Sequence, residues 1–298
     1  MRRILLAGLL LLAPCALADD LLEKVEHGFA DSNGVKIHYA SMGEGPLIVM
    51  IHGFPDFWYS WRNQMPALAE KYHVVAIDQR GYNESDKPEG QENYTLDLLA
   101  ADVVAVIKHL GEEKATVVGH DWGGMVAWWT AMYHPEAVDK LVILNLPHPK
   151  CFTRELAINP EQTKNAKYAQ DFINKPIPEV LTPQALAWLV AKDDAETSAV
   201  YQAAFEKSCL ECMINYYKEN YPKEPYQQDP RDLPRIKVPV LQFHGLKDTA
   251  LHANGLNNTW DWLDNTWTLV TVPNASHWVQ HDAPEVVTNN MLDWLARN

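Results

Sequence analysis

The sequence is short of positive charge. Its 298 residues include 25 Lys and Arg against 39 Asp and Glu, which gives a formal net charge of −14. Nucleic acids and anionic membrane surfaces bind basic proteins, so this balance argues against both as partners. The charge does not define a substrate. Internal repeats and low-complexity tracts are also absent, and the 47 % of apolar residues are enough to form a full core.

Long apolar runs are scarce as well. One run lies at the N-terminus, where two arginines precede an apolar stretch at 4–12 that is too short to span a bilayer. Residues 16–18, Ala-Leu-Ala, then form an A-x-A cleavage pattern. We therefore expect residues 1–18 to be a removable signal peptide. The mature protein is then secreted or periplasmic and has no membrane span.

Cysteine is rare, with four residues in the chain. Cys15 falls in the predicted signal, which leaves Cys151, Cys209 and Cys212. This odd number does not suggest a disulfide framework. The C-x-x-C pair at 209 and 212 lacks the second pair of ligands that a structural zinc site needs. We expect two thiols one helical turn apart, and no metal.

Short apolar runs alternate with helix-length stretches along most of the chain. "PLIVMIH" (46–52) is typical of a strand that is buried on both faces, and "VKIHYASM" (35–42) follows the hairpin turn signal Asn33-Gly34. Further predicted strands are 73–78, 115–120, 141–146, 238–245 and 267–272, and predicted helices are 58–70, 95–110, 122–134, 252–263 and 284–297. This alternation predicts an α/β fold with a mostly parallel sheet and helices on both faces.

The alternation stops near Pro147. Residues 148–235 are rich in Tyr, Pro and charge and contain no run of the buried-strand type. The α/β pattern resumes at "IKVPVLQFHG". We therefore predict a core formed by residues 19–147 and 236–298, with a helical cap inserted at 148–235.

One motif lacks the serine that usually stands at its centre. "VVGHDWGG" (117–124) has the G-x-S-x-G pattern of a nucleophile elbow, a strained strand-to-helix turn, with Asp121 in place of Ser. Gly119 and Gly123 give the turn room, and the following helix directs its N-terminus at the site. Asp121 could instead cap that helix. The missing Ser argues against a serine-type esterase.

Two later residues complete a catalytic triad in the chain order nucleophile, acid, histidine. "LQFHGLKD" ends a predicted strand and places Asp248 in the loop that follows, and "VTVPNASHW" does the same for His277. The other usual place for the acid follows the strand at 141–146, where Asn145 cannot act as an anion. Each residue alone could be structural, but three in this order favour a nucleophile, a base and an orienting acid.

The motif "IHGFPD" (51–56) lies where an oxyanion loop is expected, after a buried strand and before the elbow. We predict an oxyanion hole formed by the backbone N–H groups of Phe54 and Trp122. The Phe54-Pro55 bond is a candidate for a cis peptide in a tight turn. His52 is interpreted as structural.

Several of these segments together resemble one family. "HGFPDFWYSWRNQMPALA", "DQRGYNESDKP", "VVGHDWGGMVAW", "HGLKD" and "ASHWVQ" are similar to motifs of the soluble epoxide hydrolases, in the branch of the α/β-hydrolases related to haloalkane dehalogenases. The resemblance covers essentially the whole chain after residue 18. It implies an α/β-hydrolase fold, with a mostly parallel eight-stranded sheet, flanking helices and an inserted helical cap.

The resemblance also implies two cap tyrosines that protonate the epoxide oxygen. "INYYKENY" (214–221) is similar to the family motif that supplies the firmer of the two, Tyr217, and "KYAQDF" (167–172) nominates Tyr168. Tyr216, Tyr201 and Tyr221 are nearby competitors, and either nominated tyrosine could instead be a packing residue.

The core motifs do not separate an epoxide hydrolase from a haloalkane dehalogenase, which uses the same triad. A dehalogenase needs N–H donors for halide, and many of them carry Asn where Phe54 stands; Trp188 is a candidate second donor without a matching motif. An inactive binding module with the same fold is the non-enzyme alternative.

The resulting hypothesis needs no cofactor or metal. Asp121 attacks an epoxide carbon while Tyr168 and Tyr217 protonate the oxygen, and an ester forms. His277, oriented by Asp248, then activates water to hydrolyse that ester, and the diol leaves. The partners are a small hydrophobic epoxide and water, and the sequence indicates no oligomeric state.

Overall fold

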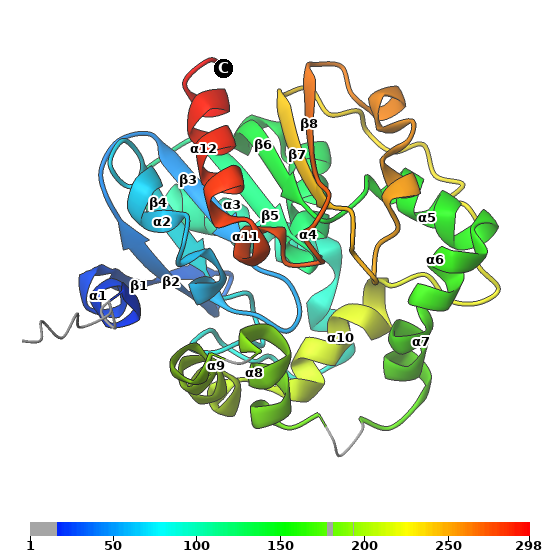
Figure 1. Cartoon of the computed structure of the whole chain (residues 1–298), viewed down its shortest axis with the longest axis horizontal. Helices are drawn as coiled ribbons and strands as arrows, with labels where there is room; N and C mark the ends of the chain where they lie inside the picture. Colours follow the sequence, from blue (N-terminus) through cyan, green and yellow to red (C-terminus); the bar gives the residue numbers. More distant parts are fainter. Residues whose placement is uncertain (1–16, 178–180, 193) are drawn as a thin grey trace, which may run out of the picture.

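The computed structural model describes residues 17–177, 181–192 and 194–298. Its centre is one eight-stranded sheet in the order β1-β2-β4-β3-β5-β6-β7-β8 (Figure 1). Neighbouring strands run parallel from β4 to β8, whereas β2 is antiparallel to both β1 and β4. The strands are β1 (Glu26–Ser32), β2 (Val35–Met42), β3 (Leu47–Ile51), β4 (His73–Ile77), β5 (Ala115–His120), β6 (Val138–Leu144), β7 (Val240–Gly245) and β8 (Trp267–Val272). The eight-stranded, mostly parallel sheet is confirmed.

The middle of the sheet is its most apolar part. Every residue of β3, β5 and β7 is buried, as continuous apolar runs require when helices cover both faces. The strands β1 and β2 join through a two-residue turn, because Ser32 pairs with Val35 on either side of Asn33-Gly34. The turn signal in the sequence is thus confirmed as a hairpin.

Helices of the predicted core lie on both faces of the sheet (Figure 1). The α-helices are α1 (Leu17–Lys24), α2 (Met65–Leu68), α3 (Leu96–His109), α4 (Trp122–Tyr133), α11 (Val279–Asp282) and α12 (Pro284–Leu295). The 3-10 helices are η1 (Trp58–Trp61), η2 (Gln91–Tyr94), η3 (Pro135–Ala137), η4 (Ala253–Leu256) and η5 (Thr259–Trp262).

Two of the predicted helices are wrong as continuous elements. The stretch 252–263 forms η4 and η5, which are separated where Asn258 adopts a left-handed backbone conformation at φ 63°. The stretch 58–70 likewise divides into η1 and α2. In the first case an asparagine that tolerates positive φ ends the helical run, an effect that apolar spacing does not report.

We call residues 148–235 the cap segment, and its described residues, 148–177, 181–192 and 194–235, form six helices. They are α5 (Pro149–Ile158), α6 (Pro160–Asn165), α7 (Lys167–Asn174), α8 (Pro183–Ala191), α9 (Ala195–Lys207) and α10 (Leu210–Asn220). The described residues of this segment contain no strand. In Figure 1, α7 to α10 lie together at one end of the sheet.

The structure corrects the expectation of two free thiols. Cys209 and Cys212 form a disulfide, whereas Cys151 is free and buried. Cys209 is the N-cap of α10, and Cys212 is its third residue, so the first turn brings their Cα atoms to 5.1 Å. That separation lies within the usual range for a disulfide. An odd total therefore does not argue against a local pair.

The predicted signal peptide, residues 1–18, lies outside the described residues except for its last two. Within the described ranges, no helix combines the length and the apolar character that a membrane crossing requires.

Candidate active site

Asp121 lies at the turn between β5 and α4, with backbone angles of φ 51° and ψ −121°. The turn needs small neighbours on both sides. A Cβ on Gly119 would lie 2.1 Å from the carbonyl oxygen of Gly123, and a Cβ on Gly123 would lie 2.1 Å from that of Ile51. The Asp121 side chain makes no capping hydrogen bond to α4. The strained elbow therefore directs this carboxylate away from the helix, and the N-cap interpretation is wrong.

The structure brings Asp121, Asp248 and His277 together from three separate loops. His277 Nδ1 lies 2.9 Å from Asp248 Oδ2, and His277 Nε2 lies 3.4 Å from Asp121 Oδ2. The Asp248 side chain is 1 % exposed and those of Asp121 and His277 about a tenth. The imidazole thus lies between two buried carboxylates, with Asp248 at the nitrogen that an orienting acid occupies.

At Asp121, Asp248 and His277, charge pairing shifts the pKa further than burial does. Burial favours the neutral carboxyls, but the charge and hydrogen bonds of His277 hold the pKa values of Asp121 and Asp248 below their usual range. Burial also favours neutral imidazole, but the two carboxylates raise the pKa of His277. Asp121 is therefore ionised without help from a base. When its charge is removed, His277 loses one of the two anions that hold its proton.

The oxyanion loop meets the elbow at the Asp121 carboxylate. The backbone N–H of Phe54 donates to Asp121 Oδ1 at 2.9 Å. Trp122 is the first residue of α4, so its backbone N–H belongs to the helix end that has no intrahelical partner. The Phe54-Pro55 peptide is cis, as predicted. His52 is fully buried and accepts from the backbone N–H of Gln79, in keeping with a structural role.

Tyr217 reaches the same carboxylate from the cap segment. It lies on α10 with 2 % of its surface exposed, and its ring packs edge-on against Trp122 and Phe54 at centroid distances of 5.0 and 5.5 Å. Its ring also packs edge-on against that of Tyr168 on α7, at a centroid distance of 6.0 Å, and both tyrosines line the pocket beside Asp121. Burial raises the pKa of both tyrosines, so both hydroxyls keep their protons.

Other tyrosines that the sequence left as competitors have different partners. The Tyr216 hydroxyl donates to the carbonyl oxygen of Arg80, and the Tyr201 hydroxyl donates to Asp56 Oδ1. Tyr221 lines the pocket beside Tyr217. Trp188, the candidate second halide donor, is 64 % exposed and does not line the pocket.

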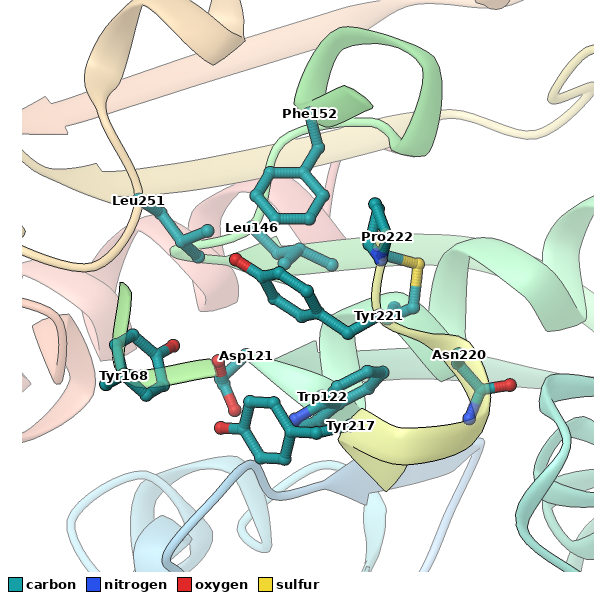
Figure 2. A pocket seen from close by; sticks show the side chains of 11 residues that line it. Asp121, Trp122, Leu146, Phe152, Tyr168, Tyr217, Asn220, Tyr221, Pro222 and Leu251 are labelled. Carbon is teal, nitrogen blue, oxygen red and sulfur yellow. The ribbon is translucent and has the colours of Figure 1, made fainter. Parts of the chain in front are cut away.

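A small pocket of about 30 Å³ connects the carboxylate with the tyrosines. Figure 2 shows Asp121, Tyr168 and Tyr217 at one end and Asn220 with Pro222 at the other. A second cavity of about 360 Å³ adjoins it, and the two cavities share the residues Met125, Phe152, Asn220 and Pro222. The space beside Asp121 therefore admits a small reacting group, and the adjoining cavity offers room for a larger substituent.

Two residues for which the sequence predicted no role also support the triad. Asn145, at the end of β6, donates from Nδ2 to Asp248 Oδ2 at 2.8 Å. His120, directly before Asp121, contacts the backbone oxygen of His277 through Nε2 at 2.8 Å. Asn145 stands at the other usual position of the acid, after β6. That position in the sequence already indicated that its amide could hydrogen-bond to Asp248.

This chain is similar in sequence to a known protein family and to two named relatives. Residues 46–284 match the family described as alpha/beta hydrolase fold. Epoxide hydrolase 1 of Caenorhabditis elegans is 35 % identical over 294 residues, covering 93 % of this chain and 72 % of that protein. Epoxide hydrolase 4 of Mus musculus is 34 % identical over 280 residues, with 88 % and 76 % covered.

The chain belongs to the α/β-hydrolase family, in its epoxide hydrolase branch. Among solved structures, a mutant of an epoxide hydrolase from Bacillus megaterium is similar, with a TM-score of 0.83 and 32 % identity over 90 % of this chain and all of that one. Another mutant of the Bacillus megaterium enzyme, complexed with its naphthyloxy-propane-1,2-diol product, has a TM-score of 0.84.

Among the described residues of this α/β-hydrolase, no three or more His, Cys, Asp or Glu side chains are grouped so that they could hold a metal ion.

Proposed function

We propose that this α/β-hydrolase converts hydrophobic epoxides to vicinal diols through a covalent ester on Asp121. One observation carries the proposal: two tyrosines whose rings pack edge-on against each other line the same small pocket as the Asp121 carboxylate. Opening an epoxide expels an alkoxide, which needs a proton, and Tyr168 with Tyr217 supplies it. The epoxide hydrolases among the relatives and the diol product of a similar structure support this reaction.

In the first step, Asp121 Oδ2 attacks an epoxide carbon, and the carbon–oxygen bond of the ring breaks. The Phe54 N–H already holds Oδ1 at 2.9 Å, which leaves Oδ2 as the attacking oxygen. A tyrosine hydroxyl gives its proton to the departing oxygen. The product of this step is a neutral ester between Asp121 and the opened substrate.

In the second step, water hydrolyses the ester. Esterification removes the Asp121 charge, so the pKa of His277 falls. The proton of His277 passes through solvent to the tyrosinate left by the first step, and the neutral imidazole becomes a competent base. His277 takes a proton from water, and Asp248 stabilises the resulting imidazolium. The hydroxide attacks the ester carbonyl, and the N–H groups of Phe54 and Trp122 stabilise the charge that develops on Oδ1. The bond between the Asp121 acyl carbon and the substrate oxygen then breaks, the proton of the added hydroxyl passes to that oxygen, and the diol leaves with the Asp121 carboxylate restored.

The adjoining cavity supports a hydrophobic substrate. Its lining includes the apolar side chains of Leu96, Met125, Trp129 and Phe152. Because the space beside Asp121 is only about 30 Å³, a substituent larger than a few atoms extends past Met125 and Phe152 into this second cavity.

A panel of aryl and alkyl epoxides and haloalkanes, scored for diol and for halide, tests the reaction class. We expect diol from epoxides and no halide above background. Halide release from haloalkanes without diol formation would establish the dehalogenase alternative. Release of neither product would favour the inactive binding module.

A single turnover in ¹⁸O-labelled water tests the covalent step. The new diol oxygen comes from Asp121, so the first diol formed should carry no label. Labelled diol in that experiment would show direct attack by water and overturn the ester mechanism.

We also propose that the mature protein is secreted or periplasmic. The basic, apolar and A-x-A features of residues 1–18 support this, and the Cys209–Cys212 disulfide suits an oxidising compartment. Fractionation of expressing cells with N-terminal sequencing tests it: a cleaved chain outside the cytoplasm is expected, and an intact cytoplasmic chain would contradict it.

A further inference from the structure

The Cys209–Cys212 disulfide has no part in the proposed reaction. It spans only two intervening residues, and disulfides that close short loops contribute least to the stability of a whole fold. Cys209 is half-buried and Cys212 is 5 % exposed. Cys209 is therefore the more exposed of the two cysteines, and the bridge acts locally on the turn that it closes.

That turn begins the helix that carries Tyr217. Cys209 caps α10, its sulfur accepts from the backbone N–H of Cys212 at 3.1 Å, and Tyr217 follows five residues later in the same helix. The helix continues without interruption from this turn to Asn220. A change in the position of the first turn is thus transmitted along a short rigid element to the tyrosine hydroxyl.

The same turn is also where α10 docks on the predicted core. The Cys209 N–H donates to the carbonyl oxygen of Gly81 at 3.0 Å, and the hydroxyl of Ser208 accepts from the Asn83 N–H at 2.7 Å. A Cβ on Gly81 would lie 2.9 Å from the Cβ of Cys212, so the contact is close-packed. The disulfide fixes the shape of the turn that fits against this loop.

We propose that Cys209–Cys212 is a thiol–disulfide exchange site, whose reaction partner is a dithiol, and that its reduction lowers the rate of ring opening through Tyr217. This rests on the proposed epoxide hydrolase function only for its effect on rate. The redox site itself rests on the position of the two sulfurs.

The exchange balances as a two-electron transfer. A thiolate of the dithiol attacks the sulfur of Cys209, the more exposed of the two cysteines; the Cys209–Cys212 bond breaks, and Cys212 leaves as a thiolate. The second thiol of the partner then attacks the mixed disulfide, so the partner is oxidised to its own disulfide and Cys209 is released. The two thiolates of α10 each take up one proton.

The experiment treats the native protein with dithiothreitol and measures three quantities: alkylation of thiols with iodoacetamide, amide hydrogen exchange of residues 210–217, and the rate of ester formation. The C151S variant of the chain that starts at residue 19 lacks both Cys15 and the buried free thiol, so only Cys209 and Cys212 are counted. We expect no label before reduction and two labels after it. Exchange along the start of α10 should become faster, and ring opening should slow roughly tenfold, because small displacements of a catalytic group cost large factors in rate.

The C209S/C212S double variant is the matched test. It should show the slower ring opening of the reduced protein and no response to dithiothreitol, whereas C151S should respond as the unaltered chain does. Reoxidation of the unaltered chain should restore its rate, which separates reduction from unfolding without relying on any variant.

Each other outcome decides one part of the proposal. Labelling that occurs only in denaturant would overturn the exchange site. Two labels with unchanged exchange in α10 and an unchanged rate would overturn the link to Tyr217. A protein that is reduced and shows faster exchange, yet opens no epoxide in either form, would contradict the proposed function and leave the redox site standing.

Discussion

The catalytic groups come from two regions that hold their side chains by different means. In the predicted core, Asp121, Asp248 and His277 each follow a strand of one parallel sheet, and hydrogen bonds of 2.8 to 2.9 Å from Asn145, Phe54 and His120 orient them or their backbone. In the cap segment, Tyr168 and Tyr217 stand on separate helices and are positioned largely by aromatic contacts.

This difference separates the two halves of the reaction. In the proposed mechanism, the core supplies the nucleophile and the water-activating base, whose positions relative to each other must stay fixed during both steps. The cap segment supplies only the proton for the leaving oxygen. Variants in the two regions should fail at different steps.

The largest effect should come from the core, in His277→Gln. The variant can still form the ester but lacks the base for its hydrolysis, so turnover should fall by roughly three orders of magnitude while alkylated Asp121 accumulates. Mass spectrometry of the protein after one equivalent of substrate measures the adduct. His134→Gln, at the far end of α4, is the control and should turn over normally. A variant that is inactive and also unmodified would remove His277 from the second step.

The cap segment should fail at the earlier step. Tyr217→Phe should slow ester formation by roughly a hundredfold, since one proton donor is lost while hydrolysis of a formed ester is unchanged. Tyr168→Phe should have a smaller effect, because Tyr168 is 36 % exposed and Tyr217 is 2 % exposed. Losing both should nearly abolish ring opening. Rapid-quench kinetics separate the two steps, with the exposed Tyr133→Phe as the control. Slower hydrolysis with normal ester formation would reverse the assignment of regions.

A smaller loss of activity is expected from Asn145→Ala, because this variant keeps all the proposed reacting groups. Asn145 donates to the Asp248 oxygen that also meets His277, so its removal should raise the pKa of Asp248 and loosen the imidazole. Ester hydrolysis should slow roughly tenfold, because a hydrogen bond to a charged group contributes about 1.5–3 kcal/mol. The pH profile of hydrolysis should shift as well. Asn289→Ala, an exposed change on α12, is the control; equal rates for both variants would deny Asn145 a positioning role.

The smallest effect concerns the joint between the two regions and changes stability rather than catalysis. Fully buried Asp56 accepts hydrogen bonds from Tyr201 of α9 and from Ser60, both at 2.8 Å, yet burial raises its pKa to about 6. The unfolded value is about 3.9, so the folded state holds this proton more tightly. Asp56 should therefore make the free energy of unfolding fall by about 2 kcal/mol as the pH rises from 4 to 7.

Urea unfolding of the unaltered chain and of Asp56→Asn, each at pH 4, 5, 6 and 7, checks this contribution. The variant lacks the titrating group, so the difference between the two curves should change with pH in the direction given. Curves that stay parallel across the range would show that Asp56 does not take up a proton in the folded protein.

The sequence predicted the core better than its connections. Asp121, Asp248 and Phe54 each follow a buried apolar run, and His277 follows the partly exposed edge strand β8. Parallel strands bring such positions to one edge of a sheet, so short local patterns were enough to group them. The support from Asn145 was missed because it depends on a contact across 103 positions in the chain. The disulfide was missed because counting cysteines ignores the geometry of a helix start. The helix at 252–263 was wrong because one asparagine at positive φ ends it.

The contact between Phe54 and Asp121 has a consequence for successive turnovers. It makes the two carboxylate oxygens inequivalent: Oδ1 is held by an N–H group, and Oδ2 faces His277. If this anchoring prevents the carboxylate from flipping, the oxygen that enters from water in one cycle takes the attacking position for the next. In labelled water, the first diol is then unlabelled and every later diol is labelled. Each diol then carries the oxygen atom that entered Asp121 from solvent in the preceding cycle, so the appearance of label in the product lags the change of solvent by one turnover.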